Sequence, residues 1–142
     1  VQRVVVVGGG FIGLEMTENL ANRGLSVTLV EASDQLMPPL DPEMASPLQD
    51  HLITKRVALS LGRSVTGFEQ NADGTISVCT AAGAKYNADL VILAIGVRPE
   101  VGLARAAGIE VGDTGGIRVD DRMRTSDKRI WAVGDAIEVG IL

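Results

Sequence analysis

The beginning of the chain alternates strand-like and helix-like patterns of apolar residues. Arg3–Val7 carries a continuous β-branched run, which is typical of a strand buried on both faces. Apolar residues recur at helical spacing over Phe11–Arg23, and Gly24 follows where a left-handed helix end is common. Ser26–Glu31 has a second buried-strand pattern. Strand, helix and strand with short connections predict a right-handed βαβ unit.

A second helix and a third strand are expected next. Asp41 and Pro42 are typical of an N-cap and a first helical position, and the helix should run to about Arg56. Pro47 lies inside this stretch and is expected to distort or restart the first turns. Val57–Leu61 is typical of a short strand.

The hydrophobic period then changes to two, which is typical of short antiparallel strands. Three such strands are expected over Ser64–Gln70, Thr75–Thr80 and Ala84–Asn87. A buried parallel strand, a short helix and a last apolar strand follow at Leu90–Ile95, Glu100–Ala107 and Ile130–Val133. The predicted fold class is α/β: a Rossmann-like parallel sheet flanked by helices, with a three-stranded antiparallel meander. The expected parallel strands are Arg3–Val7, Ser26–Glu31, Val57–Leu61 and Leu90–Ile95.

Composition narrows the function classes. The 142 residues are 46% hydrophobic and 22% charged with a net charge of −5, which argues against a nucleic-acid or anionic-membrane surface. One cysteine and one histidine exclude an intrachain disulfide and most histidine-based zinc sites, so we expect no metal site. The longest apolar runs are too short to span a membrane and no signal peptide is visible, so a cytoplasmic protein is expected.

The turn after the first strand has the spacing of a phosphate-binding loop. Gly8-x-Gly10-x-x-Gly13 follows a strand, opens a helix and lies inside a βαβ unit. Gly8 permits the tight turn, Gly10 lets a pyrophosphate approach the backbone, and Gly13 lets the helix pack closely. The helix N-terminus offers N–H groups and a partial positive charge. The alternative is a glycine-rich turn without a ligand.

Glu31 lies at the end of the second strand, where an acid accepts hydrogen bonds from the adenosine ribose. It would repel a 2′-phosphate, and residues 32–35 contain no arginine to bind one, which favours NAD(H) over NADP(H). A solvated strand-end carboxylate is the alternative. Glu15 is one turn into the helix, near the expected nicotinamide end, but a solvated polar stripe with Glu18 explains its position equally well.

Three ordered motifs resemble a known family. They are Gly8–Met16, Ala94–Pro99 and Ile130–Ala136, and together they span nearly the whole chain. The chain resembles the flavin-dependent pyridine nucleotide-disulfide oxidoreductases, in the branch of NADH oxidase, NADH peroxidase and coenzyme A-disulfide reductase. The resemblance implies an NAD(H)-binding domain over residues 1–110, inserted into an FAD domain. Residues 111–142 would be the return segment that joins the FAD domain of the full-length protein, and the start at Val1 without methionine suggests a piece of a longer chain.

The resemblance also implies residue roles. Gly8, Gly10 and Gly13 would hold the NAD pyrophosphate, and Glu31 would hold the adenosine ribose. Ile12 and Glu15 would lie near the nicotinamide, and Gly96 and Val97 would form a second loop against the cofactor. Gly134 and Asp135 would contact FAD only in the full-length protein. Glu100 departs from the asparagine common after the Arg-Pro pair in the family that the chain resembles.

No catalytic residue is expected in this chain. The family's reactive cysteine would precede it, and Cys79 is interpreted as an inert thiol with no lysine or histidine in the local sequence to activate it. His51 is expected to be structural or solvated, and Trp131 to be a packing residue.

The resemblance implies hydride transfer from NADH to FAD and then to a disulfide, peroxide or oxygen, with the fragment alone inactive. The expected partners are the FAD domain of the parent chain and a second copy in a homodimer. A stand-alone NAD(H)-binding sensor is the alternative, although Gly134-Asp135 speaks against it. A self-sufficient dehydrogenase with a Tyr–Lys pair is disfavoured, because Lys85 and Tyr86 would point to opposite faces of a strand.

Overall fold

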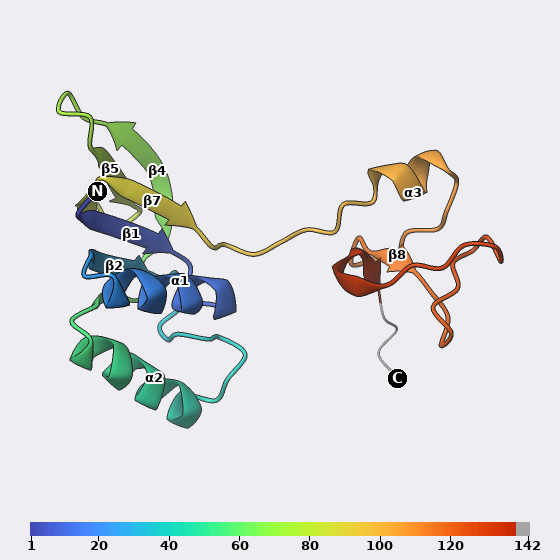
Figure 1. The fold of residues 1–142 in the computed structure, drawn as a ribbon, viewed down its shortest axis with the longest axis horizontal. Coiled ribbons are helices and arrows are strands. Elements are labelled where there is room, and N and C mark those ends of the chain that lie inside the picture. The colour runs from blue at the N-terminus through green and yellow to red at the C-terminus, as the bar shows by residue number, and fades with distance from the viewer. Residues whose placement is uncertain (139–142) are drawn as a thin grey trace. The chain divides into compact units, whose positions relative to one another are not determined.

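The computed structural model describes residues 1–138 and divides into two compact units, Val1–Gly96 and Val97–Leu142 (Figure 1).

The first unit is built on a parallel sheet, as the sequence predicts. Its strands are β1 (Arg3–Val7), β2 (Ser26–Val30), β3 (Ala58–Ser60) and β7 (Leu90–Leu93), in the spatial order β3-β2-β1-β7. All three pairings are parallel, and β1 pairs along its length with both β2 and β7. The continuous valine run of β1 is explained by this central place, because both of its faces are covered.

Alternate valines of β1 enter two different cores. Val4 and Val6 join a cluster that includes Leu29 and Leu52, and Leu14 and Leu20 of the helix α1 (Phe11–Asn22) pack against it. Val5 and Val7 face the other way and pack with Val30, Val78 and Ala88. Because side chains alternate between the two faces of β1, the helices pack on one face of the sheet and the antiparallel strands pack on the other.

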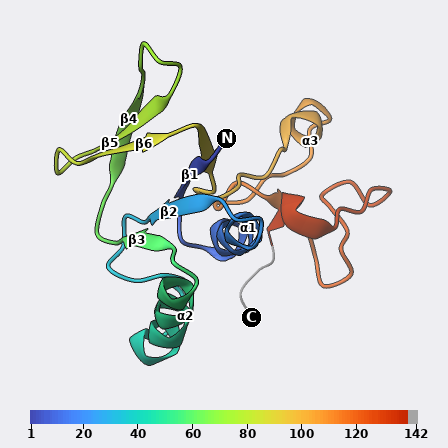
Figure 2. The same cartoon turned by 60° about the vertical axis from the view of Figure 1, so that its left-hand side comes forward.

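The antiparallel meander has the predicted three strands. They are β4 (Val65–Gln70), β5 (Ile76–Thr80) and β6 (Lys85–Ala88), in the order β4-β5-β6. Figure 2 shows this meander apart from α1 and from the second helix α2 (Pro42–Thr54).

The helix α2 does not restart at Pro47, as the sequence had suggested it could. The helix is continuous through Pro47, and Pro42 occupies its first turn, as predicted. Pro47 deprives only the Glu43 carbonyl of its helical partner, and this carbonyl lies in the exposed first turn, where water can replace the lost hydrogen bond. Asp41 is the N-cap by backbone position, but its side chain makes no capping hydrogen bond.

One carboxylate joins two neighbouring strands of this sheet. Asp89 accepts hydrogen bonds from the backbone N–H groups of Gln2 (2.7 Å) and Arg3 (2.9 Å), and from the Arg3 guanidinium (2.8 Å). The backbone N–H of Arg3 is the largest of the contacts that hold the pKa of Asp89 well below its usual range. The charged Asp89 side chain thus fastens β1 beside β7 at their amino ends.

The second unit has little regular structure. Its elements are α3 (Gly102–Ala106), β8 (Ile117–Arg118), the 3-10 turn η1 (Gly134–Ala136) and β9 (Ile137–Glu138), with β8 and β9 paired in parallel. The strand expected over Ile130–Val133 is absent, and only a single bridge joins Trp131 to Arg124. Trp131 is 57% exposed, so its predicted packing role is not fulfilled within this unit. A strand needs a neighbouring strand to pair with along its length, and within this unit this segment has only the one bridge. None of the helices in residues 1–138 is long and apolar enough to cross a membrane.

Candidate functional site

The turn between β1 and α1 is shaped by glycines that no other residue could replace without strain. Gly8 has φ +108°, and a Cβ there would overlap the carbonyl oxygen of Ala94. A Cβ on Gly13 would overlap the carbonyl oxygen of Gly8. The close packing of α1 on the turn, which the glycine spacing predicts, therefore depends on both residues.

Gly10 has a different environment. It is the N-cap of α1 with ordinary backbone angles (φ −81°, ψ −172°), and a Cβ there would meet nothing within 4 Å. No side chain caps the helix, and its first intrahelical bond runs from Leu14 N–H to Gly10 O (2.9 Å). The N–H groups of the first turn therefore have no helical carbonyl or capping side chain and adjoin open space, which suits an anionic group such as a phosphate.

Glu31 directly follows β2 and lies against this turn. Its side chain is only 9% exposed, and its carboxylate accepts hydrogen bonds from Gly9 N–H (2.6 Å) and Ser33 N–H (2.8 Å). A carboxylate has about four acceptor positions, so two remain after these backbone bonds, enough for the hydroxyls of a ribose. The structure thus brings the predicted acid and the predicted glycine turn together.

The middle glycine of the turn is a site residue that the spacing argument missed. A Cβ on Gly9 would lie 2.8 Å from Leu36 Cδ2 and 3.2 Å from the Glu31 carboxylate. Gly9 is therefore required for Glu31 to approach its N–H. The motif Gly8-Gly9-Gly10 contains this glycine, but only the contact with a residue 22 positions away explains it.

Arg63 is a second residue that the sequence argument missed. Gly62 N–H donates to Ser33 O (2.8 Å) and Arg63 N–H donates to Glu31 O (2.8 Å), so the segment after β3 lies beside the segment after β2. Residues 32–35, which follow Glu31 in the sequence, contain no arginine or lysine. No local signal could have found Arg63, because the pairing of β2 with β3 brings it there.

The remaining predicted site residues are distributed over both units. Ile12 is 55% exposed on α1, and Gly96 ends the first unit with φ +103°. Val97 belongs to the second unit, as do Gly134 (φ +81°) and the exposed Asp135 in η1.

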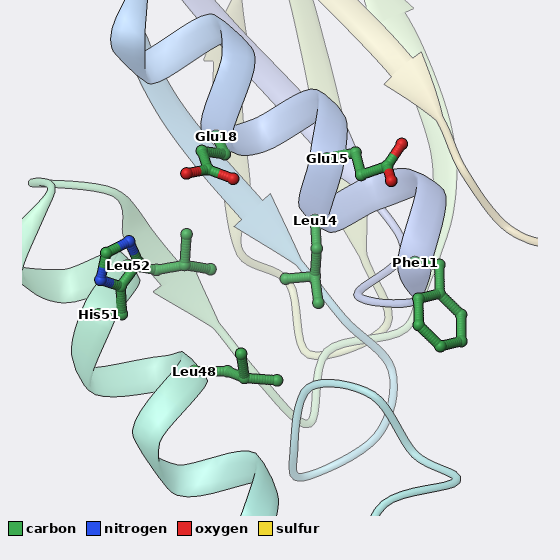
Figure 3. A pocket seen from close by; sticks show the side chains of 7 residues that line it. All are labelled: Phe11, Leu14, Glu15, Glu18, Leu48, His51 and Leu52. Atoms are coloured by element: carbon green, nitrogen blue, oxygen red, sulfur yellow. The ribbon is translucent and has the colours of Figure 1, made fainter.

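Glu15 lines a small apolar pocket between α1 and α2 (Figure 3). The pocket has a volume of about 150 Å³ and is lined by Phe11, Leu14, Glu15, Glu18, Leu48, His51 and Leu52. In Figure 3 the three leucines lie between the helices, whereas the Glu15 carboxylate points away from α2. His51 is exposed, in keeping with a solvated side chain. The glycines of the turn and Glu31 do not line this pocket, so it is separate from the site described above.

Cys79 has a lysine beside it in the fold, although none lies in its local sequence. The register of β5 and β6 places Lys85 directly opposite Cys79. Lys85 Nζ, however, is paired with Glu69 Oε2 at 2.6 Å, and this contact raises the pKa of Lys85 and lowers that of Glu69. Tyr86 points away from Lys85, since its hydroxyl hydrogen-bonds to Ser60 Oγ at 2.5 Å. Residues 1–138 contain no group of three or more His, Cys, Asp or Glu placed to hold a metal ion.

Comparison with known proteins agrees with this geometry. The chain is 39% identical over 142 residues to an NADH oxidase of Methanocaldococcus jannaschii, matching 97% of this chain and 30% of that protein. A crystal structure of an FAD-dependent pyridine nucleotide-disulphide oxidoreductase from Desulfovibrio vulgaris has a TM-score of 0.89 and 44% identity, over 96% of this chain and 35% of that one. A water-forming NADH oxidase from Lactobacillus brevis, solved bound to NADH, has a TM-score of 0.87 and 34% identity, over 96% and 30% of the two chains.

The chain therefore spans about a third of the length of these relatives. The family model for pyridine nucleotide-disulphide oxidoreductases matches residues 1–141. Together with the parallel sheet, the glycine turn and the acid that follows β2, this match shows that the chain belongs to the pyridine nucleotide-disulphide oxidoreductase family.

Proposed function

We propose that this chain is the NAD(H)-binding part of a flavin-dependent oxidoreductase that passes a hydride from NADH to FAD and on to a disulfide, peroxide or oxygen. The observation that carries the proposal is the buried Glu31 carboxylate bonded to the glycine turn beside an open helix N-terminus. This arrangement offers N–H donors for a pyrophosphate and acceptors for a ribose at neighbouring points.

The shape of the turn fits a dinucleotide. The open space at Gly10 leaves room for a phosphate against the backbone, whereas Gly8 and Gly13 hold the helix in place beneath it. Glu31 would orient the adenosine ribose through the two acceptor positions that its backbone bonds leave free. Ile12, Glu15, Gly96 and Val97 are proposed to contact the nicotinamide end.

The second unit is proposed to serve the flavin. The exposed Asp135 follows Gly134 in a short turn, and its carboxylate could accept hydrogen bonds from flavin hydroxyls in the full-length protein. When bound, FAD would supply the redox chemistry, and this chain would supply binding and orientation. The proposed division is an NAD(H)-binding domain over residues 1–110 and a return segment over residues 111–142, with the FAD domain of the parent chain as partner and a homodimer as the assembly.

The test separates folding from binding at Gly10 of the turn. Titration calorimetry of the chain with NADH should give binding that Gly10→Ala weakens by more than about tenfold, because the added methyl group fills the space for the phosphate. The variant should unfold within about 1 kcal/mol of the wild type, since the methyl group meets no protein atom. Ser26→Ala is the control, because Ser26 is exposed at the amino end of β2. A glycine such as Gly74 is unsuitable as a control, because its positive φ would strain an alanine there.

Two results would contradict the proposal. NADH binding that is unchanged in Gly10→Ala would show that the turn has only a structural role. Sustained NADH oxidation by the flavin-free chain would contradict the assignment of the chemistry to FAD.

A further inference from the structure

The backbone of an arginine lies at the adenosine end of the proposed site, although residues 32–35 contain no cationic side chain. The two hydrogen bonds from Gly62 N–H and Arg63 N–H extend the pairing of β2 with β3 past the ends of both strands. Arg63 is thereby held next to Glu31 in backbone position, and its long side chain is exposed. In the part of the chain that the structure describes, no carboxylate lies within ion-pair distance of its guanidinium.

The charge on Glu31 is already partly offset. Its two oxygens accept hydrogen bonds from Gly9 N–H and Ser33 N–H, both within 2.8 Å, and the side chain is nearly buried. Backbone N–H dipoles aimed at a carboxylate reduce the potential that it projects towards a neighbouring anion. Asp34 acts in the opposite sense, because its Oδ1 lies against Gly62, where a Cβ would be 2.8 Å away. This edge of the site therefore combines two carboxylates and two N–H donors with the backbone of an exposed arginine.

The chemistry that distinguishes two dinucleotides is located at this point. An acid after the second strand binds the 2′-hydroxyl of the adenosine ribose, and an arginine nearby accommodates a 2′-phosphate. Arginine suits this role because its planar guanidinium binds phosphate oxygens through two parallel hydrogen bonds. Such an arginine need not come from the segment after β2, provided that the fold brings it to the same edge.

We propose that Arg63 is a specificity-determining residue that binds the 2′-phosphate of a phosphorylated dinucleotide at the edge of the Glu31 site. The proposal rests on the proposed function, since Glu31 must first place the adenosine ribose. Discrimination between NADH and NADPH is then set by the balance of Glu31 and Asp34 against Arg63. The preference for NADH over NADPH is then weaker than the preference that Glu31 would impose alone.

The experiment compares two probes that differ only in the 2′-phosphate. ADP-ribose and 2′-phospho-ADP-ribose carry the pyrophosphate and the adenosine but no nicotinamide, so they report on this end of the site alone. Each is titrated calorimetrically into the chain and into Arg63→Ala, Arg63→Lys and Arg23→Ala. Arg23 is an exposed arginine at the carboxyl end of α1, the opposite end from the glycine turn, and its variant removes the same charge.

Arg63→Ala should weaken binding of 2′-phospho-ADP-ribose by roughly three- to tenfold and change that of ADP-ribose by less than about twofold. Arg63→Lys should recover part of the loss, Arg23→Ala should cause none, and the difference should shrink as salt is raised. Asp34→Asn should strengthen binding of the phosphorylated probe alone.

Equal effects of Arg63→Ala on both probes, or no effect on either, would overturn the proposal while leaving the NAD(H) assignment intact. A wild-type chain that binds neither probe nor NADH would instead overturn the proposed function, and the inference with it.

Discussion

Glu31 stabilises the fold as well as the proposed ligand, and removal of its carboxylate should be measurable without any nucleotide. Glu31→Ala would leave the buried N–H of Gly9 and the half-buried N–H of Ser33 without the acceptors that now lie 2.6 and 2.8 Å away. Hydrogen bonds to a charged acceptor contribute about 1.5–3 kcal/mol each, and water entering the space would recover part of that. The expected loss in the free energy of unfolding is about 2–4 kcal/mol.

Glu31→Gln sharpens the prediction. The amide oxygen can accept one of the two N–H bonds, but its NH₂ group would face the other donor, so about half of the loss should remain. Urea unfolding followed by far-ultraviolet circular dichroism is suitable, because the only tryptophan, Trp131, lies in the second unit, whereas the first unit holds the parallel sheet. Amide exchange at Gly9 should accelerate in both variants.

Glu18→Ala is the matched control, since Glu18 is an exposed glutamate on α1 and its removal should cost less than about 0.5 kcal/mol. If Glu31→Ala were no more destabilising than this control, the carboxylate would not hold the glycine turn in place. The preformed geometry argued for the site would then be refuted.

Three further predictions concern other contacts of the first unit. Gly13→Ala should destabilise the chain by about 1–3 kcal/mol in the same urea assay, because its Cβ would overlap the carbonyl of Gly8; wild-type stability would refute that packing. Asp89 has a lowered pKa, so its contribution to stability should be complete above about pH 4 and decline as the pH falls towards the depressed value. Asp89→Asn should flatten the acid branch of a stability–pH profile, and an unchanged branch would contradict the assignment. Tyr86→Phe should cost about 0.5–1.5 kcal/mol by removing the bond to Ser60 Oγ, with no change expected if that hydroxyl is instead bonded to water.

The parallel sheet and meander were predictable because their signals are local. The β-branched run of β1 and the period of two in β5 each reflect which faces of a strand are covered, and this pattern is present in the residues themselves. The strand predicted over Ile130–Val133 does not form, and the reason is the complementary one. Its apolar pattern is strand-like, but a strand forms only where a neighbour is available, and its own unit supplies a single bridge.

The candidate site was predictable only in part. The spacing of Gly8, Gly10 and Gly13 identified the turn, and the end of β2 identified Glu31. The reason for Gly9 and the presence of Arg63 could not be predicted, because each depends on a contact between segments far apart in the sequence. The same holds for Lys85 opposite Cys79, which only the register of the hairpin reveals.

The order of strands in the sheet also constrains when this domain can fold. The central strand β1 is complete by residue 7, yet one of its two neighbours, β7, begins at residue 90. During synthesis on a ribosome β1 can pair with β2 early, but its other edge stays open until the meander and β7 have emerged. Closing so long a loop is slow, because its entropy is lost before the new contacts form. The hydrogen bonds of Asp89 with Gln2 and Arg3 join residues that are 87 and 86 positions apart in the sequence. They therefore form only at this last step, when β7 arrives and completes the sheet.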